Sequence, residues 1–94
     1  MTDRKHFESV TEQLADLYVE KNTRYKDSFS KLFQKSGIST SVIRINDKVN
    51  RLEALASDPT DDGGDESIID TLKDLANYAI LTIMELEKQK SEVE

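Results

Sequence analysis

The stretch that decides the fold is ESIIDTLKDLANYAILTIMEL, residues 66–86. Its large apolar residues recur at steps of three and four, which predicts one long amphipathic helix. We expect this helix to begin near residue 65 or 66 and to run to about residue 90. Its apolar face is broader than one seam requires, so it should pack on two neighbouring helices or on another subunit.

The polar side of this helix carries a stripe of carboxylates. Glu66, Asp70 and Asp74 follow at every fourth position and therefore lie on one face. Like charges at this spacing repel by roughly 0.2–0.5 kcal/mol per pair. A divalent metal ion or a basic stripe on another helix would offset the repulsion, whereas a fully solvated stripe would need neither. Because the stripe spans about 12 Å, one ion would use Asp70 with one neighbour rather than all three.

A matching basic stripe lies on the preceding helix, which we predict over about residues 40–56 with Ser39 or Thr40 as its N-cap. Its buried side is predicted from the apolar periodicity, namely Val42, Ile45, Val49, Leu52 and Ala56. An adjacent face carries Arg44, Lys48 and Arg51, with Asp47 at its edge.

Two further helices are predicted nearer the N-terminus. The first covers about residues 3–23, and its stripe is Phe7, Val10, Leu14, Leu17 and Lys21. Lys21 either lays its stem on this surface with its ammonium in water or points into a site. After a turn, a short helix should bury Phe29, Leu32 and Phe33 and end at Gly37 as its C-cap.

Together these elements predict an all-α fold, a bundle of about four helices in a single domain over residues 1–94, with a core over about 5–88. Residues 57–65 form an acidic loop, because they contain one proline and two glycines. The C-terminal tail, residues 87–94, is expected to fray. Since only 36% of the residues are hydrophobic and 6% aromatic, one copy is thinly stabilised, and we expect homo-oligomerisation to complete the bundle.

The composition excludes several classes of protein. The chain has no cysteine, which rules out disulfides and thiolate metal sites and fits a cytoplasmic protein. Its apolar runs are too short to span a membrane, and no signal peptide is evident. The net charge of −6 argues against direct binding of duplex DNA, although a local basic pocket can still bind a nucleotide. The only histidine, His6, lies near the N-terminus, so histidine catalysis is not expected.

Short motifs follow one another in order through residues 17–87. They are Tyr18, Lys21, Asn22, Tyr25, Asp27, Ser28, Phe29, Gly37, Ile43, Arg44, Ile45, Asp47, Lys48, Arg51, Leu52, Asp65, Glu66, Ser67, Ile68, Asp70, Thr71, Asp74, Leu75, Ala76 and Tyr78. This ordered set resembles the first of the nucleotide modification associated domains, a small phage and prophage family. One position departs from that pattern, because Lys26 stands where we expect glycine. The resemblance implies a role in phage nucleotide or DNA modification inside a bacterial host cell, and implies no particular reaction.

A looser similarity is to the all-α nucleoside triphosphate pyrophosphatases of the MazG and dimeric dUTPase type. Those enzymes bind magnesium through acidic residues on adjacent helices, with paired glutamates in an ExxE helix. Here the helix over residues 40–56 contains only Asp47 and Glu53 as acids, so the ExxE motif is absent.

Three functions stay open at this point, and whether the chain is an enzyme stays open with them. We favour a nucleotide-binding module that uses Lys21, Asn22, Tyr25, Asp47, Lys48 and Arg51. The second is a pyrophosphohydrolase whose Mg²⁺ is held by Glu66, Asp70 and Asp74. The third is a structural or protein-interaction module in which the acidic stripe pairs with Arg44, Lys48 and Arg51.

Overall fold

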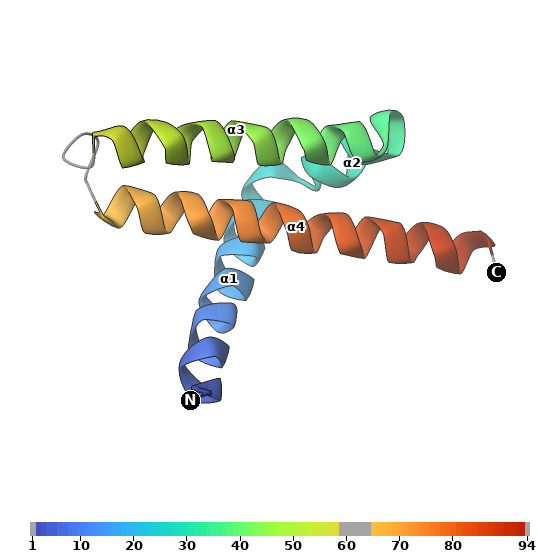
Figure 1. Cartoon of the computed structure of the whole chain (residues 1–94). Helices are drawn as coiled ribbons and strands as arrows, with labels where there is room; N and C mark the ends of the chain where they lie inside the picture. Colours follow the sequence, from blue (N-terminus) through green and yellow to red (C-terminus); the bar gives the residue numbers. More distant parts are fainter. Residues whose placement is uncertain (1, 59–64, 94) are drawn as a thin grey trace.

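The computed structural model describes residues 2–58 and 65–93, with the side chains of 65, 66, 92 and 93 left out. In these ranges the chain forms four helices and no strand, which confirms the all-α prediction (Figure 1). The helices are α1 (Arg4–Tyr25), α2 (Ser28–Ser36), α3 (Ile38–Ser57) and α4 (Asp65–Val93). Most of the predicted acidic loop, 59–64, lies outside the described residues.

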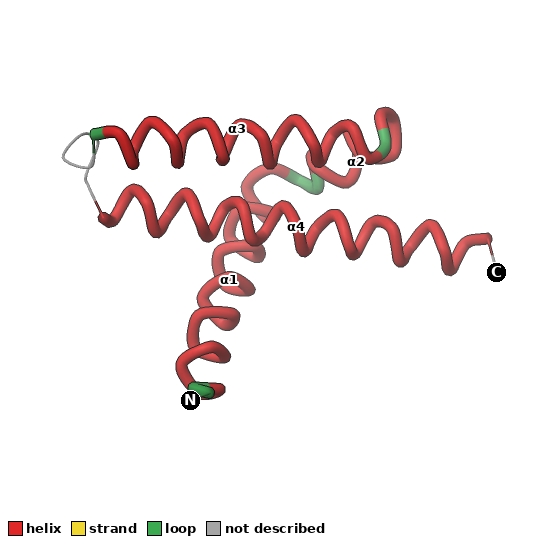
Figure 2. The backbone as a smooth tube through the Cα atoms, viewed as in Figure 1, coloured by secondary structure: helices red, strands yellow, loops and turns green. Residues whose placement is uncertain are grey.

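Helices α3 and α4 lie antiparallel, side by side, and form one layer (Figures 1 and 2). The short α2 lies beside the N-terminal end of α3, and α1 projects away from the layer after meeting α4 near its middle. Small hydroxyl side chains let α3 and α4 approach closely. Thr82 Oγ1 and Ser41 Oγ are hydrogen-bonded at 2.6 Å, and both residues are buried.

The apolar core of the described residues is small. Its buried members are Leu14 of α1, Phe33 of α2 and Leu55 of α3, of which Phe33 is fully buried. The Phe33 ring lies 6.0 Å from the ring of Phe29, which in turn lies 5.7 Å from the ring of Tyr78. This chain of rings fixes α2 against α4.

Several residues of the predicted apolar stripes are exposed instead, including Phe7 of α1, Ala56 of α3 and Leu72 of α4. Leu32 is 37% exposed and Val42 is 56% exposed, so the prediction that both are buried is wrong for this chain alone. The periodicity identified the apolar sides of α2 and α3 correctly, but α4 packs against the Ser41 side of α3 rather than the Val42 side. An apolar stripe on a helix therefore does not by itself say which neighbour covers it.

The junction at Gly37 also differs from the prediction. Gly37 is the C-cap of α2, as expected, but α3 begins directly after it at Ile38, so neither Ser39 nor Thr40 is an N-cap. The physical reason is the backbone of Gly37, with φ of 65° and ψ of −148°, which turns the chain without an intervening loop. The two hydroxyls instead donate back to α2, Ser39 Oγ to the Ser36 carbonyl and Thr40 Oγ1 to the Leu32 carbonyl.

The turn between α1 and α2 contains two successive residues in the left-handed conformation. Lys26 has φ of 53° and Asp27 has φ of 60°. The Lys26 amide donates to the Asn22 carbonyl and so closes the last turn of α1. Glycine adopts this conformation without steric cost, whereas a side chain costs on the order of 1 kcal/mol. The sequence analysis expects glycine at position 26, where this chain has lysine. The positive φ of Lys26 explains why glycine suits this position.

Replacing Lys26 with glycine is therefore expected to raise the free energy of unfolding by about 0.5–1 kcal/mol. The matched control is Lys31→Gly, also an exposed lysine but inside α2, which should lower the same free energy by about 1 kcal/mol. Urea unfolding followed by circular dichroism measures both changes. Equal losses in the two variants would show that the turn carries no strain at Lys26.

Candidate functional site

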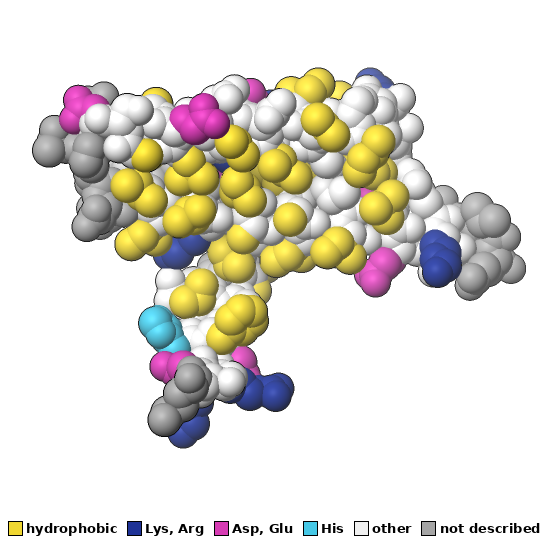
Figure 3. All heavy atoms as spheres, in the orientation of Figure 1, with side chains coloured by type: hydrophobic (Ala, Val, Ile, Leu, Met, Phe, Trp, Pro, Cys, Tyr) yellow, Lys and Arg dark blue, Asp and Glu magenta, His cyan; other side chains and the backbone are white. Residues whose placement is uncertain are grey.

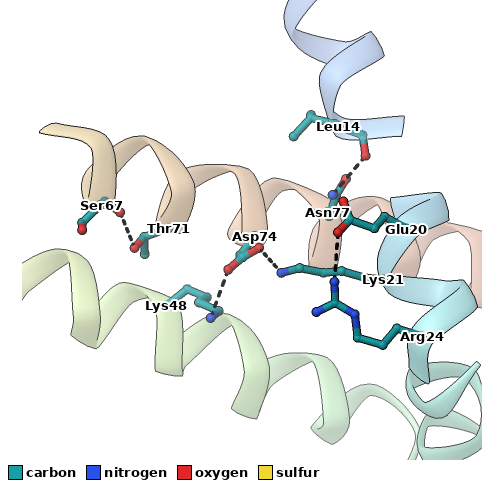
Figure 4. A network of polar contacts seen from close by, with 9 residues as sticks. All are labelled: Leu14, Glu20, Lys21, Arg24, Lys48, Ser67, Thr71, Asp74 and Asn77. Atoms are coloured by element: carbon teal, nitrogen blue, oxygen red, sulfur yellow. Dashed lines mark hydrogen bonds and ion pairs between the residues drawn. The ribbon is translucent and has the colours of Figure 1, made fainter. Parts of the chain in front are cut away.

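The carboxylate of Asp74 lies between two lysines from different helices (Figure 4). Lys21 Nζ of α1 lies 2.7 Å from Asp74 Oδ1, and Lys48 Nζ of α3 lies 3.3 Å from Asp74 Oδ2. The Asp74 side chain is 21% exposed, so this contact is only partly screened by water. Asp74 of the acidic stripe thus meets cations from α1 and α3, which confirms its pairing with Lys48.

A neighbouring amide fixes α1 on α4. Asn77 Nδ2 donates to the Leu14 carbonyl at 3.2 Å, one turn along α4 from Asp74 (Figure 4). This bond places the second half of α1 across α4 and so brings Lys21 within reach of Asp74.

A pocket opens beside this contact, where all four helices meet, with a cavity volume of about 370 Å³. We call it the interhelical pocket. It is lined by Tyr18, Lys21, Asn22, Tyr25, Asp27, Ser28, Phe29, Ser30, Arg44, Asp74, Asn77, Tyr78, Leu81, Met84, Glu85 and Lys88. Pockets that hold small molecules and cofactors have volumes of about 300–1,000 Å³, so this one suits a ligand of nucleotide size.

Cationic and aromatic side chains share this lining. The cations are Lys21, Arg44 and Lys88, and each comes from a different helix. The rings include Tyr18 and Tyr25, which lie seven residues apart on α1 and therefore on one face of it. The Arg24 guanidinium lies 5.8 Å from the centre of the Tyr25 ring, an arrangement typical of a cation–π contact.

A second ion pair lies at the far side of the interhelical pocket. Lys88 Nζ donates to Glu85 Oε2 at 2.8 Å, and Glu85 is buried. This hydrogen bond raises the pKa of the Lys88 ammonium, an effect that burial opposes and that the charges of Glu85, Tyr18 and Asp27 support. Lys88 thus stays positively charged at neutral pH and above.

The predicted site residues fall into two groups. Lys21, Asn22, Tyr25 and Asp74 line the interhelical pocket, and Lys48 contacts Asp74 without being part of the lining. The structure does not bring the others into this lining: Asp47 and Arg51 are exposed on α3, Asp70 is exposed on α4, and the Glu66 side chain lies outside the described residues.

Sequence reasoning missed several lining residues. Tyr18 could have been found, because it lies three residues before Lys21 and seven before Tyr25, on the same face of α1. Arg44 belonged to the predicted basic stripe but not to the predicted site. Tyr78 belonged to the ordered motif set but not to the predicted site, whereas Glu85 and Lys88 carry no local signal, since only the packing of α4 brings them to the pocket.

The predicted magnesium ligands do not form a cluster in the described part of the chain. No three His, Cys, Asp or Glu side chains described there converge well enough to hold a metal ion. Asp70 is exposed, and both oxygens of Asp74 face lysines. These residues give no support to a resident metal, and a role for Mg²⁺ stays a prediction.

The sequence pattern of nucleotide modification associated domain 1 matches residues 21–86, about 70% of the chain. The chain belongs to this family. The matched region of this nucleotide modification associated domain contains every residue of the interhelical pocket except Tyr18 and Lys88, which lie just beyond its two ends. No curated protein and no solved structure matches the chain. In the described residues of this family member, no helix is long and apolar enough to cross a membrane.

Proposed function

We propose that the interhelical pocket binds a phosphorylated nucleoside and that the protein serves nucleotide or DNA modification through this binding. The observation that carries the proposal is the combination of aromatic rings and three cationic side chains around one cavity of about 370 Å³. A base offers a flat face that stacks on aromatic rings, and a phosphate offers oxygens that accept from lysine and arginine. The family's name supports the link to modification.

The side chains of the pocket suit the two chemical parts of a nucleotide. Tyr18 and Tyr25 of α1 provide rings for the base, and the Asn22 amide between them can bond to a base edge or a sugar hydroxyl. Arg44, on α3, is the cation best suited to phosphate, because its guanidinium donates two parallel hydrogen bonds. Among the described residues Arg44 forms no ion pair, whereas Lys21 and Lys88 each contact a carboxylate.

The setting we propose is the cytoplasm of a bacterial cell that carries a phage or prophage encoding this protein. The support is membership of the nucleotide modification associated family, whose motifs resemble those of phage and prophage proteins, together with the absence of cysteine and the net charge of −6. An acidic surface repels duplex DNA, so the free nucleotide is the better-matched ligand.

Isothermal titration with a panel of deoxynucleotides and modified nucleotides tests the proposal directly. Each titration is run with and without Mg²⁺, and the mixture is then separated by chromatography. We expect saturable binding of at least one nucleotide with no product. Release of pyrophosphate in the presence of Mg²⁺ would identify a pyrophosphohydrolase instead, and no binding across the panel would overturn the proposal.

Arg44→Ala is expected to weaken nucleotide binding by about tenfold or more, because it removes a charge-assisted contact to phosphate. The matched control is Arg51→Ala, seven residues later on α3 and thus on the same side of the helix, but outside the pocket lining. We expect this control to bind within about twofold of the unchanged protein, since exposed charges outside a site contribute little. The reverse order of effects would move the phosphate site along α3 to Arg51.

A further inference from the structure

One large feature of the molecule lies away from the interhelical pocket. The layer of α3 and α4 carries a broad apolar surface that continues onto α1, with charged side chains mainly at its borders (Figure 3). We define the apolar face by Val42 of α3 and by Ile69, Leu72, Ile80, Ile83 and Leu86 of α4. These six side chains are between 43% and 56% exposed.

The apolar face and the interhelical pocket occupy opposite sides of α4. Residues two apart on a helix are rotated by about 200°, so Ile83 points away from the pocket residues Leu81 and Glu85 on either side of it. Leu72 is separated in the same way from Asp74. The ligand proposed for the pocket therefore leaves this face uncovered.

In the described part of the chain, more large apolar side chains are exposed than are buried. The described residues contain three buried apolar side chains but thirteen large hydrophobic ones that are at least 37% exposed. Half of each side chain of the apolar face amounts to on the order of 60 Å², so the six together present roughly 350 Å². Apolar side chains of α1 continue this surface (Figure 3), toward the roughly 800 Å² that each partner contributes to a standard interface.

We propose that the apolar face binds the same face of a second copy of this chain. A layer of two antiparallel helices is self-complementary, because a twofold axis stacks it on its copy and yields a four-helix arrangement. The net charge of −6 makes an anionic lipid surface a poor alternative, since interfacial helices rely on lysine and arginine around their apolar side. The second copy supplies the core that the single chain lacks.

The mass in solution tests this proposal first. Light scattering over a dilution series should give twice the chain mass of 10.7 kDa at micromolar concentration, and the thermal midpoint should rise with protein concentration. A single-chain mass throughout would overturn the proposal and assign the face to a different partner. A thermal midpoint that does not change with concentration would also count against it.

Two neighbouring residues of α3 supply a matched pair of variants. Val42 and Ile43 are 56% and 58% exposed, but they are rotated by about 100° from each other, and only Val42 belongs to the apolar face. Val42→Glu should raise the dissociation constant of the dimer by about 100-fold, because two unpaired carboxylates are buried in each dimer. Ile43→Glu should leave it unchanged, and an equal effect of both would show that another surface forms the dimer. Should Val42→Glu lose its helical circular dichroism, the wild-type dilution series alone decides.

Discussion

Phe33→Ala is expected to lower the free energy of unfolding by about 3–5 kcal/mol, the largest effect of any single change in this chain. Phe33 is 1% exposed, and its ring contacts the Phe29 ring, which leads on to Tyr78 of α4. Truncation leaves a cavity at the point where α2 is held against the rest of the fold. Few other apolar side chains are buried, so the rest of the core contributes too little burial to offset the loss of the Phe33 ring.

Urea unfolding followed by circular dichroism measures this effect, at one fixed protein concentration so that any self-association is held constant. The matched control is Leu32→Ala, the preceding residue on α2, which is 37% exposed and should cost about 1 kcal/mol or less. Phe33→Leu should cost about 1–1.5 kcal/mol, and it reports on the site if the alanine variant does not fold. Equal losses for Phe33→Ala and Leu32→Ala would show that the centre of the core lies elsewhere.

The number and kind of elements could be predicted from the sequence because each helix carries its own signals. Glycine at 37 marks the end of α2, and the three-and-four periodicity marks α1, α3 and α4. The boundaries were less certain: α1 extends to Tyr25 and α4 to Val93, each past the predicted end. Where a helix stops depends on the backbone conformation of the next residues, as at Lys26, which periodicity does not report.

Burial was harder to predict than helicity. Val42 and Leu72 lie on well-formed apolar stripes, yet both are exposed in the single chain. An apolar stripe predicts that another surface covers these side chains. It does not predict whether that surface belongs to the same chain or to another one. The sequence interpretation of α4, with two neighbours or another subunit, kept both options open for this reason.

The candidate site was partly predictable because some of its residues are close in sequence. Lys21, Asn22 and Tyr25 lie close together on α1 and could be predicted from the helical stripe that ends at Lys21 together with the ordered motif set. The choice between Arg44 and Arg51, or between Asp70 and Asp74, could not, because the members of each pair lie on similar sides of one helix. The crossing of α1 over α4 selects Asp74, and the position of α2 beside the start of α3 selects Arg44.

Asp74→Ala is expected to lower the free energy of unfolding by about 1.5–3 kcal/mol. It leaves the ammonium groups of Lys21 and Lys48 without the carboxylate that both contact, at 2.7 and 3.3 Å. The estimate lies between the cost of about 3–5 kcal/mol for breaking a buried pair and that of about 0–1 kcal/mol for a surface pair, because the three side chains are between 21% and 44% exposed. Asp70→Ala, one turn earlier on the same helix and exposed, is the matched control and should change stability by less than about 0.5 kcal/mol.

The isosteric variant Asp74→Asn separates two roles for this carboxylate. If Asp74 only neutralises Lys21 and Lys48, the variant frees both ammonium groups for phosphate, and nucleotide should bind at least as tightly as before. If Asp74 holds Mg²⁺, binding that depends on Mg²⁺ should be lost, because an amide is a far weaker ligand than a carboxylate. We expect the first result, since both oxygens of Asp74 already face lysines and Asp70 is exposed on the turn before. Loss of Mg²⁺-dependent binding would instead support a metal site at the acidic stripe. The rate of nucleotide hydrolysis would then be the next quantity to measure.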